Sequence, residues 1–166
     1  MKNIALLFLL FISSLNFAKA QTDYCKEIVK TRHAEKQYSS YDTPGLEHIY
    51  LNNTISDGDT TGLVTVLFLA TKKTADYNAG GLYVTFADGT VWKDEGAHLN
   101  CSYINSDYGY RYGGASVLDD KDALLPFKTK KIVKILMGDI EIPISDEYAT
   151  KFKAWANCIE HINQIK

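Results

Sequence analysis

The stretch KIVKILMGDIEIPI, residues 131–144, decides the fold class of this chain. Apolar residues alternate with other residues around a Gly-Asp pair at 138–139, which is typical of two antiparallel strands joined by a two-residue turn. Such a turn pairs Met137 with Ile140. The resulting apolar face consists of Val133, Ile135, Met137, Ile140, Ile142 and Ile144. Pro143 falls on the other face and cannot donate to a neighbouring strand, which predicts an edge strand.

A second hairpin is predicted within GLYVTFADGTVWKD, residues 81–94. The Asp-Gly pair at 88–89 suits a two-residue turn, because both central residues of that turn need a positive φ. The turn pairs Phe86 with Val91. The apolar face then consists of Leu82, Val84, Phe86 and Val91, and the other face of Tyr83, Thr85 and Trp92.

Four more strands follow from the same alternation with a period of two. They are predicted over residues 48–55, 63–70, 98–104 and 108–118. The second of them, LVTVLFLA, is apolar at nearly every position and not only at alternate ones. This pattern is typical of a strand covered on both sides, so a central and fully buried strand is predicted there.

One helix is expected at each end of the folded region. Residues 23–37 lack Gly and Pro and place their few apolar side chains on one side, which predicts a short, weakly amphipathic helix. The turn-rich segment 38–47 is expected to end it. Near the C-terminus, Ser145 is a preferred N-cap residue type for a helix over 146–165. The apolar stripe of that helix consists of Tyr148, Phe152, Trp155, Ile159 and Ile162.

Together these elements predict an α+β fold that is mainly antiparallel β. Six or seven strands are expected to form a curved sheet or a β-sandwich, flanked by the short N-terminal helix and the amphipathic C-terminal helix. Residues 21–166 are expected to be a single globular domain, because 146 residues can enclose one hydrophobic core. No linker, repeat or low-complexity segment divides them.

The first twenty residues are predicted to be a cleavable signal peptide. They carry Lys2, an apolar run over 4–12 and a small-x-small site at 18–20, which is the usual order of such signals. A membrane anchor is the alternative, but the run is shorter than the roughly 20 residues that span a bilayer. We therefore expect a secreted or periplasmic protein that starts at Gln21 and has no membrane span.

The charge of the chain argues against nucleic acid as a partner. The formal net charge is −2, and loss of the two lysines in the signal peptide makes it −4. The remaining lysines are scattered, apart from the short run KTKK at 128–131. No basic patch that would neutralise phosphates is therefore predicted.

Three cysteines are present, and export would place them where disulfides persist. Cys101 shares a predicted strand face with Leu99 and Tyr103, which predicts burial, whereas Cys25 and Cys158 lie on the two predicted terminal helices. We expect a bridge between Cys25 and Cys158, which would close a loop of more than a hundred residues. Other pairings stay open, because connectivity does not follow from sequence alone.

The strip formed by Tyr108, Tyr110 and Tyr112 is the strongest candidate for a binding surface. Tyrosines on one strand face are rigid and amphipathic, which suits stacking on sugars or contact with a protein. Trp92 is a further ligand-binding candidate. The alternative is that these rings pack within the sheet, since tyrosine is common on half-buried strands.

No catalytic, metal or cofactor site is predicted. His98 and Cys101 are three residues apart on a strand, so they point to opposite faces, and no nucleophile motif is present. The four histidines are far apart in the sequence, and the Asp-rich turn at 57–62 lacks the glutamate of a calcium loop. We therefore expect an exported non-catalytic binding or interaction module whose ligand is a protein or a glycan.

Two other functions remain as hypotheses. A small exported hydrolase would use acidic residues as general acid and base, with Asp94, Glu95, Asp119 and Asp120 as candidates. A buried carboxyl with a raised pKa in a cleft would favour it. A structural component of an envelope assembly would differ from a binding module only in the permanence of its partner.

Overall fold

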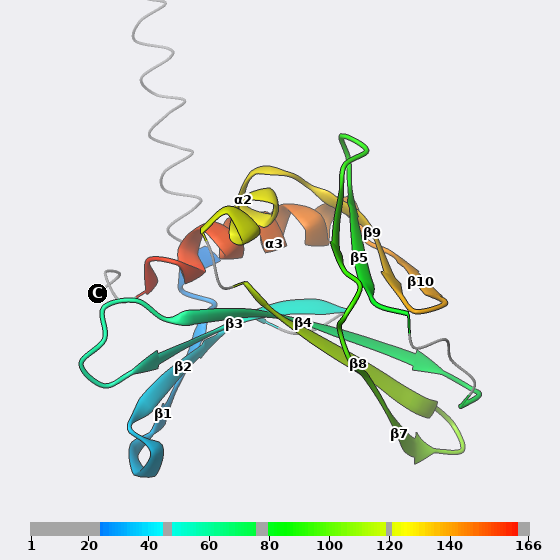
Figure 1. Cartoon of the computed structure of the whole chain (residues 1–166), viewed down its shortest axis with the longest axis horizontal. Coiled ribbons are helices and arrows are strands. Elements are labelled where there is room, and N and C mark those ends of the chain that lie inside the picture. The colour runs from blue at the N-terminus through cyan, green and yellow to red at the C-terminus, as the bar shows by residue number, and fades with distance from the viewer. Residues whose placement is uncertain (1–23, 45–47, 76–79, 119–120, 163–166) are drawn as a thin grey trace, which may run out of the picture.

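The computed structural model describes residues 24–44, 48–75, 80–118 and 121–162 (Figure 1). Their strands form two antiparallel sheets of six and four strands. The six-stranded sheet has the order β1 (Val29–His33), β2 (Tyr38–Asp42), β3 (Ile49–Ser56), β4 (Leu63–Lys72), β8 (Gly109–Leu118) and β7 (Leu99–Asn105). The four-stranded sheet has the order β10 (Ile140–Pro143), β9 (Ile132–Met137), β5 (Leu82–Phe86) and β6 (Val91–Asp94). Two helices accompany the sheets, α2 (Lys121–Thr129) and α3 (Asp146–Ile159).

The predicted class is confirmed at the level of an α+β fold that is mostly antiparallel β. The number of strands is larger than predicted, ten in the described residues instead of six or seven. Six of these strands lie in one sheet, and the other described helices and strands cover one of its two sides. The number of strands and the arrangement in layers both depend on pairings between segments that are distant in the sequence.

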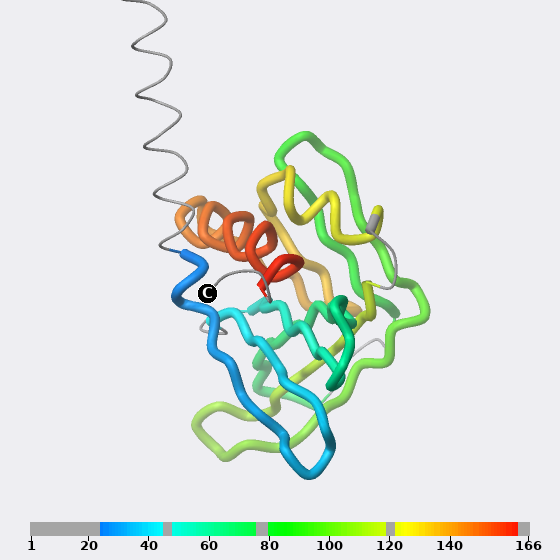
Figure 2. The backbone as a smooth tube through the Cα atoms, turned by 90° about the vertical axis from the view of Figure 1, so that its left-hand side faces the viewer, coloured from blue at the N-terminus to red at the C-terminus, as the bar shows by residue number. Residues whose placement is uncertain are grey.

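The helices and the four-stranded sheet lie on the same side of the six-stranded sheet (Figure 1). Figure 2 shows α3 above the strands from a second direction. We call the sheet face toward α3 the inner face; its fully buried side chains include Leu51, Val66, Phe68 and Tyr112. We call the other side the open face, because no helix or strand among the described residues covers it.

The hairpin of β9 and β10 has the predicted register. Met137 pairs with Ile140, and the turn glycine, Gly138, has a positive φ of 58°. β10 is an edge strand, as Pro143 predicted. Val133 was wrongly placed on the apolar face: the pairing of β9 with β5 shifts register at this point, and Val133 is exposed. The buried residue is its neighbour Ile132, because a bulge reverses the side-chain alternation.

The hairpin of β5 and β6 has a longer loop than predicted. The amide of Phe86 donates to the carbonyl of Thr90, and Gly89, with φ 83°, donates to the carbonyl of Phe86. The loop therefore contains three residues, and Val91 pairs with Thr85 instead of Phe86. This shift of one position exchanges the two faces of β6. Val91 is exposed, and Trp92 is the residue that packs against the core.

The predicted N-terminal helix over 23–37 is wrong. Residues 29–33 form β1, a short 3-10 helix follows at Ala34–Lys36, and β2 occupies the first half of the segment that was predicted to be a turn. The few apolar residues of 23–37 gave only a weak helical stripe, whereas residues 29–33 pair with β2 along their whole length. Tertiary hydrogen bonding overrides a weak local preference here.

Strand β4 is central, as predicted, but only one of its faces is fully buried. Val64, Val66 and Phe68 point to the inner face and are buried, whereas Leu67 and Leu69 on the open face are half-buried. The apolar character on both sides of this strand therefore does not reflect a second covering layer. The open face retains partly exposed leucines.

Helix α2 was not predicted from the sequence. It has nine residues and contains Pro126, so its local signal is weak. Packing holds it in place: the ring of Phe127 contacts Phe86, Trp92 and Phe152, at centroid distances of 5.7, 5.3 and 6.1 Å. These edge-to-face contacts join α2 to the four-stranded sheet and to α3.

Helix α3 begins as predicted. The Oγ of Ser145 accepts a hydrogen bond from the amide of Tyr148, which satisfies one free donor of the first turn. The whole predicted stripe is buried, and it consists of Tyr148, Phe152, Trp155, Ile159 and Ile162. The helix ends at Ile159, earlier than the predicted 165, and residues 163–166 lie outside the described part of the chain.

The cysteines that the sequence analysis paired, Cys25 and Cys158, form a disulfide. Their Cα atoms are 5.4 Å apart, and the bridge closes a sequence separation of 133 residues. Cys101 is free and half-buried. The indole Nε1 of Trp155 also donates to the carboxylate of Glu27 at 3.0 Å, so two contacts attach the N-terminal segment to α3.

Replacing both Cys25 and Cys158 by alanine is expected to lower the free energy of unfolding by about 4–5 kcal/mol, because a very long loop is no longer closed in the unfolded chain. Urea unfolding measures the effect. Cys101→Ala is the control and should change the free energy by less than about 1.5 kcal/mol. An unchanged midpoint in the double variant would contradict this role of the bridge.

Gly109→Ala is expected to destabilise the protein more than Gly89→Ala. Both glycines have a positive φ, 78° and 83°, so alanine is strained at either position by about 1 kcal/mol. A Cβ at Gly109 would also lie 2.5 Å from the carbonyl oxygen of Lys72, whereas one at Gly89 would meet open space. The extra crowding should cost about 1–3 kcal/mol, measured as the difference between the two variants in urea unfolding. Equal losses would show that the backbone near Lys72 yields freely.

The charge on Asp88 is expected to favour folding above pH 3.8. Hydrogen bonds from Lys130 and Thr90 lower the pKa of Asp88 from 3.8 to about 2. The stabilisation is therefore complete above the unfolded value and is lost as the pH falls toward 2. In Lys130→Met the pKa of Asp88 should rise, as read from its carboxyl carbon by NMR. Lys134→Met is the control: it removes the ion-pair partner of Glu141 and should leave the pKa of Asp88 unchanged.

Candidate functional site

The end of the β7–β8 hairpin carries three tyrosines with accessible rings. Tyr103 and Tyr108 are 63 % and 64 % exposed, and Tyr110 is half-buried. Tyr103 pairs with Tyr110 across the two strands, and their rings meet edge to face with centroids 5.4 Å apart. We call these three residues the tyrosine end. It points away from the helices (Figure 1).

The loop of this hairpin is fixed by local hydrogen bonds. The Oδ1 of Asn105 accepts from the amides of Asp107 and Tyr108, at 3.0 and 2.9 Å. The Nζ of Lys73 donates to the carbonyl of Asp107, which attaches the loop to the chain that follows β4. The tyrosine end is therefore held by a defined turn, and its rings need little ordering when a ligand binds.

The structure separates the four aromatic residues that the sequence had grouped as ligand-binding candidates. Tyr108 and Tyr110 lie at the tyrosine end. Tyr112 is fully buried, and its hydroxyl donates to the carbonyl of Thr74 at 2.6 Å. Trp92 packs between Phe68 and Phe127, with centroid distances of 6.1 and 5.3 Å. Tyr112 thus belongs to the hydrophobic core, and Trp92 packs against it.

The separation has a simple cause. Strand β8 runs from the free end of its hairpin into the core, so Tyr110 and Tyr112 share a face but differ in what covers them. Sequence reasoning missed Tyr103, which it had assigned to a buried face with Leu99. The sequence did contain a signal for Tyr103: a short turn between the two predicted strands pairs it with Tyr110, which was itself a ligand-binding candidate.

A second accessible surface is the open face over β1 to β4. Four polar side chains there form a continuous chain of hydrogen bonds. The Oγ of Ser40 donates to Oδ2 of Asp42 at 3.3 Å, the Nδ2 of Asn52 donates to Oδ1 of Asp42 at 2.7 Å, and the Oγ1 of Thr54 donates to Oδ1 of Asn52 at 2.9 Å. Asp42, Asn52 and Thr54 are half-buried, so solvent reaches this chain.

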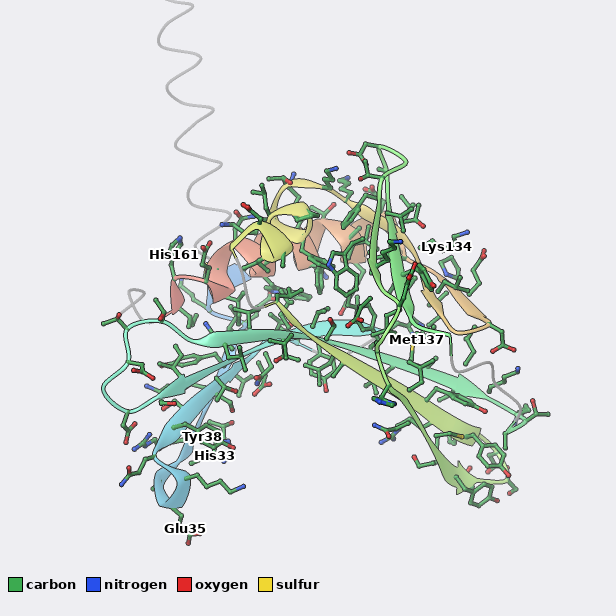
Figure 3. All side chains as sticks on the ribbon, viewed as in Figure 1. His33, Glu35, Tyr38, Lys134, Met137 and His161 are labelled. Carbon is green, nitrogen blue, oxygen red and sulfur yellow. A yellow bond between two sulfur atoms is a disulfide. The ribbon has the colours of Figure 1, made fainter. Side chains whose placement is uncertain are left out.

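Aromatic rings flank the polar chain. His33 and Tyr38 stack with their ring centroids 4.4 Å apart at the outer end of the β1–β2 hairpin (Figure 3). The Nε2 of His33 lies 3.3 Å from the Oγ of Ser40. Burial raises the pKa of the Tyr50 hydroxyl, and the negative charge of Asp42 raises it further. The negative charge of Asp42 thus acts on the side chains around it in this part of the open face.

The polar chain does not have the geometry of a nucleophilic triad. In such a triad a histidine stands between the serine and the carboxylate, whereas here Ser40 stands between His33 and Asp42. His33 therefore gains no orientation from the acid. Cys101 is half-buried on β7, and the nearby His98 precedes this strand and is exposed.

The two acidic candidates that lie in the described residues, Asp94 and Glu95, are each engaged in local contacts. Asp94 is half-buried and accepts hydrogen bonds from the Oγ of Ser116 at 2.6 Å and the amide of Gly96 at 3.1 Å. Glu95 is exposed and paired with Lys93. Asp119 and Asp120 lie outside the described residues. Asp94 thus fixes the local structure.

The described ranges contain no cluster of three or more His, Cys, Asp or Glu side chains that would hold a metal ion. Within the same residues, no helix has the length and apolar character needed to cross a membrane. A shallow depression of about 530 Å³ lies on the inner side of the β1–β2 hairpin and is lined by Lys30, Ser39, Tyr41, Ile55 and residues 56–60. Lys30 lies 5.4 Å from the Tyr41 ring centroid there.

Comparison with known proteins gives no family for this chain. No protein-family model matches it, and neither the curated proteins nor the solved structures include a match.

Proposed function

We propose that this protein is an exported, non-catalytic binding module that engages a protein or a glycan through the tyrosine end. The observation that carries the proposal is the group formed by Tyr103, Tyr108 and Tyr110, whose rings are accessible at the end of a hairpin with a fixed turn. Tyrosine rings combine apolar area with a hydroxyl and lose little conformational freedom on binding.

Two features support export. The first twenty residues have the order of a signal peptide, and the Cys25–Cys158 disulfide is a bond that persists mainly in oxidising compartments. Both features suit a secreted or periplasmic protein.

The hydrolase hypothesis receives less support. Three carboxyls in the described residues have a clearly displaced pKa, those of Asp57, Asp88 and Glu147, and all three are lowered by neighbouring basic or polar groups. A general acid needs a displacement in the other direction. A binding role is therefore the better supported of the two.

Replacing Tyr103, Tyr108 and Tyr110 together by serine is expected to abolish ligand capture without unfolding the protein. The parent chain and the variant are used as baits on secretions and envelope fractions of the source cells and on a glycan array, after circular dichroism has shown equal folding. The parent should retain a partner that the variant loses by at least about tenfold, the effect of removing one or two aromatic anchors.

The matched control replaces three exposed apolar residues elsewhere, Val91, Leu125 and Val133, by serine. This control should keep the partner, because it removes a similar amount of exposed apolar surface from other elements. Equal capture by the parent and the tyrosine variant would refute the proposed role of the tyrosine end. Loss in the control as well would point to non-specific apolar adsorption.

A further inference from the structure

The open face has a cross-strand row of residues near its middle. Backbone pairing places Val29 opposite Asp42, Asp42 opposite Asn52, Asn52 opposite Thr65 and Thr65 opposite Val117. Cross-strand neighbours on one face lie about 5 Å apart, so this row crosses five strands in register. Asp42 is its acidic member.

The carboxylate of Asp42 is half-buried and has only neutral hydrogen-bond donors as partners. Ser40 and Asn52 provide them, at 3.3 and 2.7 Å. The two basic side chains of β1 lie on the other face, because side chains alternate along a strand. There Lys30 lies over the ring of Tyr41, and Arg32 forms an ion pair with Asp57.

The other ionisable groups of the open face do not neutralise Asp42. His33 reaches it only through Ser40, and Tyr50 is a phenol. The Nδ1 of His48 forms a hydrogen bond with the carbonyl oxygen of Leu69, at 3.1 Å. Arg111 lies on β8 six residues along from Val117, which is about 20 Å along the strand. Among the described residues, no basic side chain on this surface therefore pairs with the half-buried carboxylate of Asp42.

Apolar side chains lie on both sides of the polar chain of β2 and β3. Val29, Leu63 and Val117 point to the open face and are 58 %, 49 % and 49 % exposed. Val29 is the cross-strand neighbour of Asp42, whereas Leu63 and Val117 lie two and three strands away on β4 and β8. Every second side chain of an extended peptide points to the same side, so a peptide with apolar residues at even spacings from a basic residue would match this pattern.

We propose that the open face binds an extended segment of a partner protein and that Asp42 is the counter-ion for a lysine or arginine side chain of that segment. The cation replaces the water that a partly buried carboxylate otherwise retains, and Val29, the cross-strand neighbour of Asp42, covers the stem of the basic side chain. Val117, at the other end of the row, contacts an apolar residue of the same segment. The site is independent of the tyrosine end and adds a second contact surface to the module.

The test is an NMR titration of the isotope-labelled chain, produced in an exporting host with its disulfide formed. The probes are three capped peptides that differ at one position, acetyl-Leu-Ser-Lys-Ser-Leu-amide, acetyl-Leu-Ser-Gln-Ser-Leu-amide and acetyl-Leu-Ser-Glu-Ser-Leu-amide; in each, the central residue and the two leucines point to the same side of the extended chain. The lysine peptide should shift the amide signals of Asp42, Asn52 and Thr65 in a saturable way and should bind at least about fivefold more tightly than the glutamine peptide, the effect expected for one ion pair of about 1 kcal/mol.

Two variants distinguish the ion pair from general stickiness. Asp42→Asn should reduce the affinity for the lysine peptide at least about fivefold, to that of the glutamine peptide. Val29→Lys keeps Asp42 but places an ammonium group opposite it, and it should weaken binding to a similar degree. Asp59→Asn, at an exposed acid in the loop between β3 and β4, is the control and should leave binding unchanged.

Three outcomes would overturn the proposal. The first is the absence of saturable shifts near Asp42 with the lysine peptide. The second is equal binding of the lysine and glutamine peptides, which would indicate apolar contact alone. The third is a shift of the same amides by a methyl glucoside in place of the peptide, which would identify a sugar as the occupant. None of these outcomes bears on the tyrosine end, whose test uses other residues.

Discussion

The packing of helix α3 against the inner face of the six-stranded sheet is the interaction on which the rest of the structure depends. The hydroxyl of Tyr148 donates to the backbone carbonyl of Ile49, and the side-chain Nδ2 of Asn53 donates to the backbone carbonyl of Ile159 at 2.8 Å. Both ends of the helix are therefore joined to β3. The ring of Phe152 meets Phe127 of α2, and Cys158 holds the N-terminal segment. Helix α3 therefore positions α2 and the N-terminal segment relative to the six-stranded sheet.

This arrangement explains which surfaces remain available. Helix α3, helix α2 and the four-stranded sheet all occupy one side of the six-stranded sheet, so the other side has no cover in the described part of the chain. The tyrosine end extends from the same sheet, where β7 and β8 continue beyond the core. The molecule presents a rigid hairpin end and a broad sheet face together, and in the proposed binding role its disulfide and cross-strand pairing would limit the entropy lost on binding.

Sequence reasoning succeeded where one element determined its own geometry. The alternation around Gly138 gave the register of β9 and β10, and the Ser145 cap with its apolar stripe gave the start and the buried face of α3. It failed where a neighbour decided the outcome. A loop one residue longer than expected exchanged Val91 and Trp92 between faces, and pairing with β2 made a strand of residues that were predicted to be helical. The proline-containing helix α2 depends on aromatic contacts with three other elements.

The sequence by itself determined the antiparallel character of the chain and its C-terminal helix, because period and capping are local properties. The pairing of Cys25 with Cys158 was one of several that the sequence allowed, and the tertiary structure selected it. Only the tertiary structure decided which tyrosines are accessible. Tyr110 and Tyr112 are two residues apart and share a strand face, yet one lies at the free end of a hairpin and the other is fully buried. The open face and the polar chain around Asp42 were likewise beyond local reasoning, because they join residues of separate strands through hydrogen bonds that only the sheet brings within reach.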